Sequence, residues 1–164
     1  RQEFEQLAQK QPSNAGAYTM VGTILQTQKK DTDARQWYEK ALRANPHAAV
    51  AANNLAWLLA ESGQDLSTAL QYAEQAQKIS PEQPDIGDTL GWIYYKQDNA
   101  PLAIREFRRS IAKNPQNPSY HYHLGLAYLK AGQKEPAKQS LQEALRLNPD
   151  FPEASDAKSR LNTL

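Results

Sequence analysis

Three histidines and a pair of neighbouring aspartates are the residues of this chain whose types could bind a metal or transfer protons. His121 and His123 are two residues apart on a predicted helix, so their side chains point about 200° apart and cannot bind one metal ion together. We expect His121 to fill a core position and His123 to face elsewhere, and His47 falls in a predicted turn. Asp85 and Asp88 share one helical turn, where carboxylates are most often capping or solvated charges. The arrangement therefore predicts neither a metal site nor acid–base catalysis.

No other motif indicates an enzyme. The chain has no Gly-x-Ser-x-Gly elbow and no phosphate-binding glycine-rich loop. Cysteine is absent, which excludes disulfides, thiolate metal sites and cysteine nucleophiles. We therefore expect no catalytic residues, no metal, no cofactor and a protein that is not an enzyme.

The charges of the chain are almost balanced. It has 19 Lys and Arg residues against 18 Asp and Glu residues, a formal net charge of +1. Nucleic-acid binding needs a basic surface that displaces counterions, so we expect no nucleic-acid partner. A short basic run, Arg105, Arg108 and Arg109, is interrupted by Glu106 and is typical of a solvated helix face. No apolar run approaches the roughly 18 residues that span a bilayer, so we expect no insertion into a membrane.

A proline that closes a helix recurs every 34 or 35 residues along the chain. The prolines at this position are Pro12, Pro46, Pro81, Pro115 and Pro149. A fixed period in this range is typical of solenoids, in which one repeat cannot bury its own apolar face and must stack on its neighbours. Between the prolines, apolar residues recur three and four apart in two stretches, which predicts two amphipathic helices in each repeat.

The period divides the chain into segments that together form one predicted solenoid domain. Residues 1–14 fit the second helix of a truncated repeat, four repeats span 15–48, 49–83, 84–117 and 118–151, and residues 152–164 fit a capping helix. The second repeat has 35 residues, and its extra residue falls in a predicted loop, where neither helix has to shift. A last helix with a polar outer side would keep the final apolar face out of water.

These repeats resemble the tetratricopeptide repeat family. In the first helix, the family's Leu-Gly pair corresponds to Val21-Gly22, Leu55-Ala56, Leu90-Gly91 and Leu124-Gly125. In the second helix, its Ala–aromatic–Ala pattern corresponds to Ala34/Tyr38/Ala41, Ala69/Ala73/Ala76, Ala103/Phe107/Ser110 and Ala137/Leu141/Ala144. The family's early Trp position holds Tyr18, Ala52, Gly87 and His121. The resemblance covers essentially the whole chain and implies an all-α, right-handed α-solenoid of stacked antiparallel helix hairpins.

The first helices carry a second face that the core stripe does not use. In tetratricopeptide repeat proteins the matching face lines a concave groove that receives a segment of a partner. The resemblance therefore implies a groove formed by Thr19, Thr23, Gln26, Asn53, Trp57, Asp88, Trp92, Tyr95, Tyr122, Leu126 and Leu129. We expect the aromatic residues of this set to anchor the partner, and Asn53 and Asp88 to fix its register. The alternative is that the aromatic side chains fill a tight superhelix interior and contact only one another.

The resemblance implies a non-enzymatic scaffold that binds a protein or peptide partner as an extended or helical segment. Some family members hold acidic chaperone C-termini through Lys, Asn and Arg on this face, but the basic residues are missing here. A second hypothesis is a structural or self-associating array within an envelope or exopolysaccharide secretion complex, because the stretch NNLAWLLAESG is similar to bacterial members of that kind. That similarity favours the bacterial periplasm or envelope over the cytoplasm. A third hypothesis, glycan binding, depends on the aromatic residues alone.

Overall fold

The computed structural model of the chain describes residues 2–63 and 65–164, and within these ranges the regular structure is α-helix with no β-strand. This confirms the all-α prediction. The chain divides into two compact units, residues 1–81 and residues 82–164. The repeat boundaries and the single-domain organisation stay predictions.

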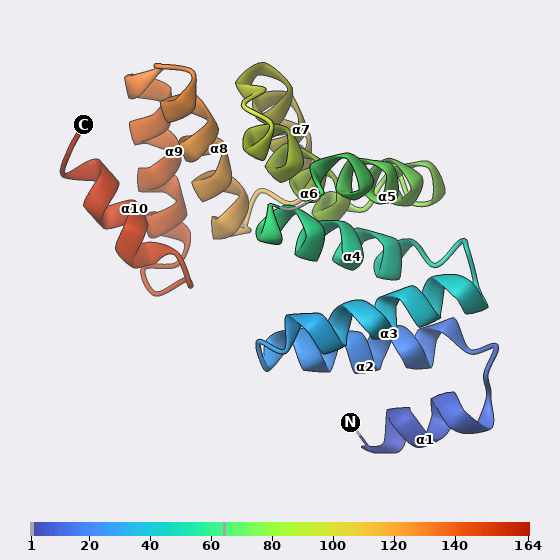
Figure 1. Cartoon of the computed structure of the whole chain (residues 1–164). Coiled ribbons are helices and arrows are strands. Elements are labelled where there is room, and N and C mark those ends of the chain that lie inside the picture. Colours follow the sequence, from blue (N-terminus) through green and yellow to red (C-terminus); the bar gives the residue numbers. More distant parts are fainter. Residues whose placement is uncertain (1, 64) are drawn as a thin grey trace. The chain divides into compact units, whose positions relative to one another are not determined.

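The first unit is built from helix hairpins that pack on one another. Its helices are α1 (Gln2–Lys10), α2 (Ala15–Thr27), α3 (Asp31–Ala44), α4 (Ala49–Ser62) and α5 (Leu66–Ile79). Short turns join α2 to α3 and α4 to α5, and the two members of each pair lie side by side (Figure 1). Helix α4 also packs against α3, so the two hairpins share one apolar core.

The second unit repeats this arrangement and ends in a single short helix. Its helices are α6 (Pro84–Lys96), α7 (Ala100–Lys113), α8 (Pro118–Lys130), α9 (Lys134–Leu147) and α10 (Ala154–Leu161). The pairs α6–α7 and α8–α9 form hairpins, α8 packs against α7, and α10 packs against α9 (Figure 1). The prediction of stacked helix hairpins is therefore confirmed within each unit.

Local sequence explains where several helices begin. The Asn14 side chain accepts a hydrogen bond from the Ala17 amide at 3.0 Å, and the Asp65 side chain accepts one from the Thr68 amide at 2.9 Å. Such caps satisfy amides that have no partner inside the helix. Helices α6, α7 and α8 have proline in their first turn, where the missing amide hydrogen costs nothing.

Glycine in the first helix of a hairpin permits close contact with a large side chain of the second. A Cβ atom added at Gly22 would lie 2.6 Å from the Tyr38 ring, and one added at Gly91 would lie 2.6 Å from the Phe107 ring. Tyr38 and Phe107 are both fully buried. The α4–α5 hairpin instead has alanine at both of these positions, since Ala56 and Ala73 are buried there. Glycine on the first helix therefore faces a large ring on the second, and alanine faces alanine, so the combined volume of the two side chains fits the space between the helices.

Among the described residues, a left-handed backbone conformation occurs in the turn inside each hairpin. The residues with this conformation lie one period apart: Lys29 (φ 58°), Gly63 (φ 67°), Asp98 (φ 60°) and Gly132 (φ 72°). Left-handed backbone costs a residue other than glycine roughly 1–2 kcal/mol. Two of the four turns therefore carry strain that glycine would remove.

We expect Lys29→Gly to raise the free energy of unfolding by up to about 1 kcal/mol, because part of the relieved strain is offset by the freedom of glycine in the unfolded chain. Urea unfolding followed by circular dichroism measures the change. The matched control is Gly63→Ala, which has open space around the added Cβ and should therefore destabilise through the backbone alone. If Lys29→Gly lowers stability, the strain assigned to this turn is wrong.

Candidate functional site

In the first unit the predicted groove residues form a mostly polar surface on α2 and α4. Thr19 and Asn53 are buried, whereas Thr23, Gln26 and Trp57 are half-buried. The hydroxyl groups of Thr19 and Thr23 donate to backbone carbonyl groups one turn earlier, at 2.8 and 3.0 Å. Trp57 is the one aromatic residue of the predicted set in this unit, and it is not sunk into the core.

A tyrosine hydroxyl group ties three helices of the first unit together beneath this surface. Tyr38 on α3 donates to the Gln26 side chain on α2 at 2.7 Å and accepts from the Asn54 amide group on α4 at 3.2 Å. Burial raises the pKa of Tyr38 above its ordinary value, although side-chain hydrogen bonds with Thr23 and Asn54 lower it in part. Sequence reasoning assigned Asn54 no role in this contact. The helical geometry could have predicted this contact, because Asn54 points about 100° away from Asn53 and toward the preceding repeat.

Asn53 stands out within the first unit. Its side chain is 8% exposed, and its Oδ1 atom has no hydrogen-bond partner among the described residues. Its Nδ2 atom makes one long contact of 3.4 Å with Oδ1 of Asn54. A buried amide oxygen without a donor costs about 1–3 kcal/mol, so this position is a local weak point of the unit.

In the second unit the predicted groove residues differ in accessibility. Trp92, Tyr95 and Leu129 are half-buried, whereas Tyr122 and Leu126 are 7% and 4% exposed. Tyr122 and Leu126 pack into a cluster with apolar residues of α9 and α10, namely Leu141, Ala144, Ala154 and Ala157. The accessible part of the predicted groove in this unit is therefore smaller than the sequence indicated.

Tyr122 is also fixed through its hydroxyl group. The hydroxyl group donates to the Asp156 carboxylate on α10 at 2.6 Å, and Arg160 on the same helix pairs with that carboxylate. Burial raises the pKa of Tyr122 far above its ordinary value, and the Asp156 hydrogen bond raises it further. Burial alone would raise the pKa of Asp156, but hydrogen bonds from Arg160 and Tyr122 outweigh it and the net shift is downward. Tyr122 therefore holds the last helix in place.

The structure reverses the predicted roles of the two histidines in α8. His123 is 5% exposed, and its Nδ1 atom lies 2.9 and 3.1 Å from the two carboxylate oxygens of Asp88 on α6. His121 is only half-buried, and its Nε2 atom lies 2.9 Å from the Pro115 carbonyl oxygen. The expectation that His121 fills the core and His123 faces elsewhere is wrong, because the face of α8 that meets the preceding hairpin is the one that carries His123.

The two aspartates of α6 are not free solvated charges either. Asp88 is 7% exposed and is bonded to His123, so the expectation of a solvated carboxylate is wrong for this residue. Asp85 is exposed but accepts a hydrogen bond from the Tyr120 hydroxyl group of α8. Burial raises the pKa of Tyr120 above its ordinary value, and the neighbouring Asp85 carboxylate raises it further. Both aspartates therefore connect α6 to α8.

Three of the predicted groove residues in the second unit are half-buried and form a small surface that we call the aromatic face: Trp92, Tyr95 and Leu129. The Trp92 and Tyr95 rings are stacked, with centroids 5.0 Å apart and planes inclined by 14°. Two lysines border these rings: the Lys96 amino group lies 5.0 Å from the Trp92 centroid, and the Lys130 amino group lies 4.1 Å from the Tyr95 centroid. Lys130 also bonds to the Tyr95 carbonyl oxygen at 2.8 Å, which fixes its position.

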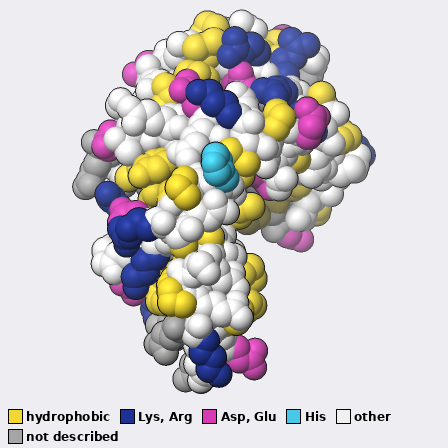
Figure 2. All heavy atoms as spheres, turned by 90° about the vertical axis from the view of Figure 1, so that its right-hand side faces the viewer, with side chains coloured by type: hydrophobic (Ala, Val, Ile, Leu, Met, Phe, Trp, Pro, Cys, Tyr) yellow, Lys and Arg dark blue, Asp and Glu magenta, His cyan; other side chains and the backbone are white. Residues whose placement is uncertain are grey.

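The basic run on α7 is only partly a solvated face. Arg105 and Arg108 are exposed, as expected, but Glu106 is 5% exposed and pairs with Arg105 at 2.8 Å. Figure 2 shows basic and acidic side chains close to one another on the face that it draws, without a single sign covering it. This distribution agrees with the balanced composition of the chain.

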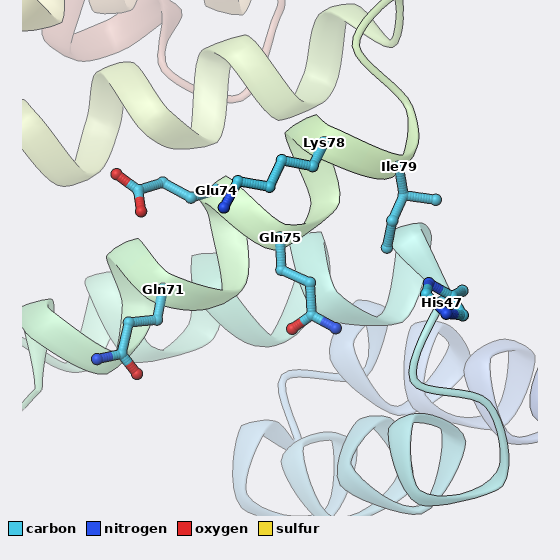
Figure 3. Close-up of a pocket in the computed structure, with 6 residues that line it drawn as sticks. All are labelled: His47, Gln71, Glu74, Gln75, Lys78 and Ile79. Atoms are coloured by element: carbon cyan, nitrogen blue, oxygen red, sulfur yellow. The ribbon is translucent and has the colours of Figure 1, made fainter.

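A cavity of about 400 Å³ lies beside α5 in the first unit. It is lined by His47, Gln71, Glu74, Gln75, Lys78 and Ile79 (Figure 3). Gln75 points from α5 toward the turn that holds His47, and its amide group donates to the Pro46 carbonyl oxygen at 2.6 Å. Within the described ranges, no cluster of three or more His, Cys, Asp or Glu side chains could hold a metal ion.

Comparison with known proteins identifies the family. Profiles described as "Tetratricopeptide repeat" match residues 1–49, 38–84 and 118–151, and a profile described as "TPR repeat" matches residues 91–132. The chain belongs to the tetratricopeptide repeat family. Proteins of this family mediate protein–protein interaction and assembly and are generally not enzymes.

Two curated relatives illustrate the range of the family. The chain is 27% identical over 145 residues to the general transcriptional corepressor ssn6 of Schizosaccharomyces pombe, which covers 87% of this chain and 13% of that protein. It is 35% identical over 78 residues to the photosystem I assembly protein Ycf3 of Prochlorococcus marinus, which covers 46% of this chain and 45% of that protein. The chain therefore spans less than half the length of either relative.

A solved structure supports the fold. A thermophilic TPR protein in Thermus thermophilus superimposes with a TM-score of 0.78 at 17% identity, over 98% of this chain and 86% of that one. At this identity the likeness concerns the fold alone. None of the helices in the described part of the chain has the length and hydropathy that crossing a bilayer requires. The compartment, self-association and glycan contact stay predictions.

Proposed function

We propose that this chain is a non-enzymatic scaffold that binds a segment of a partner protein, with the aromatic face as its main anchor. The observation that supports this most directly is the position of Trp92. Its ring is stacked on Tyr95, yet the side chain is only half-buried, so part of it can contact another molecule. Trp and Tyr in such positions commonly provide most of the binding energy of an interface.

The surroundings of the aromatic face resemble the organisation of a protein interface. An apolar centre formed by Trp92, Tyr95 and Leu129 is bordered by the amino groups of Lys96 and Lys130. Interfaces typically have an apolar core enriched in aromatic residues and a polar rim. The segment that fits this surface presents apolar side chains at its centre and polar groups at its edges.

The first unit offers a different kind of contact. Thr19, Thr23, Gln26 and Asn53 make its predicted groove surface mostly polar, with Trp57 as the aromatic exception. Asn53 keeps its proposed role in fixing the register of the partner, although its Oδ1 atom is buried and the side chain would have to turn outward to accept from a partner. The proposed role of Asp88 in fixing the register is withdrawn, since its carboxylate is bonded to His123.

Photo-cross-linking locates the surface that the partner uses. Tyr95 is replaced by a photoreactive phenylalanine derivative, and the chain is irradiated in cells of its source. The matched control carries the same derivative at Arg108, which is exposed on α7 outside the aromatic face. We expect a protein cross-linked from position 95 and absent from position 108. Equal cross-linking of the same protein from both positions would show that the aromatic face is not the binding surface.

A further inference from the structure

An ionisable pair lies directly behind the aromatic face. Asp88 of α6 and His123 of α8 are each more than nine-tenths buried, and the imidazole Nδ1 atom contacts both carboxylate oxygens. The His123 ring also lies 4.9 Å from the Trp92 ring, measured between centroids. One imidazole therefore contacts both a buried carboxylate and the proposed anchor of the partner.

Other groups that titrate lie on the helices packed around His123. On α6 they are Asp88 itself, Asp85, whose carboxylate accepts from Tyr120, and Lys96, whose amino group lies 5.0 Å from the Trp92 centroid. On α7 the contact is the Phe107 ring, at 5.6 Å, and the neighbouring Glu106 carboxylate is paired with Arg105. On α8 the Tyr122 ring lies 5.7 Å away, and its hydroxyl group donates to Asp156 of α10. Asp88 is therefore the charged group that faces the imidazole most directly.

We propose that Asp88 and His123 form a proton-dependent latch that controls how firmly Trp92 is held. When the imidazole is neutral, Asp88 and His123 share a hydrogen bond. When the imidazole takes up a proton, the contact becomes an ion pair, and a cation lies against the Trp92 ring. The latch then holds Trp92 against α8 more firmly.

The physical basis is the combination of two attractions. A free imidazole changes its charge near pH 6.5, and a carboxylate within 4 Å favours the charged form. A cation next to a tryptophan ring is attracted by about 0.5–2 kcal/mol, depending on desolvation. The consequence for binding rests on the proposed function: if Trp92 anchors the partner, capture weakens as the pH falls. The latch itself does not depend on that function.

Fluorescence of Trp92 tests the latch without any partner. The chain has three tryptophans, so Trp37→Phe together with Trp57→Phe leaves Trp92 as the single emitter. Acrylamide quenching of Trp92 is then measured between about pH 5 and pH 8, the range in which histidine titrates. We expect the quenching constant to be about twofold smaller at the acidic end, which corresponds to the lower limit of a cation–π contact.

Three variants in this background decide the assignment. His123→Gln should abolish the pH dependence, whereas His121→Gln, two residues away on the same helix, should preserve it. Asp88→Asn should move the midpoint to lower pH by about one to three units, because the neighbouring negative charge is gone. Persistence of the transition in His123→Gln, or its loss in His121→Gln, overturns the proposal.

A measurement on the parent chain covers the case in which His123→Gln does not fold. Proton NMR follows the rings of the three histidines. One imidazole signal should titrate together with the Trp92 emission, and the latch is overturned if no imidazole signal shares the midpoint of that emission change. Because no partner is present, this failure would leave the proposed binding function intact. Conversely, absence of any partner would contradict the proposed function and leave the Trp92 titration unaffected.

Discussion

Replacing Phe107 by alanine is expected to lower the free energy of unfolding by about 3–5 kcal/mol. The Phe107 ring is fully buried between α6 and α8, where it contacts Leu124, Ala127 and the His123 ring. Its removal leaves a cavity that the helices can close only in part. Urea unfolding monitored by circular dichroism measures the loss.

A substitution at Gly91 tests the contact with Phe107 more specifically. Gly91→Ala alone should destabilise by roughly 1–3 kcal/mol, because the new methyl group would lie 2.6 Å from the Phe107 ring. In the Phe107→Ala background the same change should be neutral or stabilising, since the ring is absent and alanine favours the helix by about 1 kcal/mol over glycine. The Ala56 and Ala73 pair of the α4–α5 hairpin already shows this combination in a folded repeat. An equal cost of Gly91→Ala in both backgrounds would contradict the size matching between the two helices.

The features that could be predicted from the sequence are those that repeat. The 34- or 35-residue period fixes two helices per repeat, and the Gly22 and Gly91 positions mark where the second helix approaches most closely. These features depend on contacts inside one hairpin, which are set by spacing along a single helix and by residue size. The all-α architecture follows from them.

The features that could not be predicted depend on how one hairpin meets the next. A stripe of residues three and four apart identifies one buried side of a helix, but the first helices α4 and α8 also pack against the preceding hairpin of their own unit. His123 and Asn54 both lie on that second contact, which is why they are less exposed than a single stripe implies. The Asp88–His123 pair carried a usable signal, because residues 35 apart, one more than the local period, lie side by side on the first helices of neighbouring repeats.

The sequence predicted an accessible face with aromatic residues, but not how many of the predicted residues stay accessible. Trp92 and Tyr95 lie on an accessible face, whereas Tyr122 and Leu126 are covered by their contacts with α9 and α10. The sequence of α10 shows an apolar side, yet it does not say which residues of α8 that side covers. Whether a neighbouring helix covers a residue depends on how the whole unit packs, and the sequence of one repeat does not contain this information.

Replacing Trp92 by alanine is expected to weaken partner binding by about 2 kcal/mol or more, close to a thirtyfold rise in the dissociation constant. The indole is the largest ring of the aromatic face, and it stacks on Tyr95, so its loss removes apolar contact area and also frees Tyr95 to move. Trp92 borders the core of the second unit, so circular dichroism must first show that the variant keeps its helices.

The most direct measurement is a calorimetric titration of the cross-linked partner, once identified, into the parent chain, Trp92→Ala and Trp37→Ala. Trp37 is a matched control because it is also a half-buried tryptophan, with its ring tilted against Tyr18 of α2 and outside the aromatic face. We predict that Trp92→Ala loses most of the affinity and that Trp37→Ala retains it. Unchanged affinity in a folded Trp92→Ala chain, or an equal loss in both variants, would contradict the assignment of the aromatic face as the binding surface.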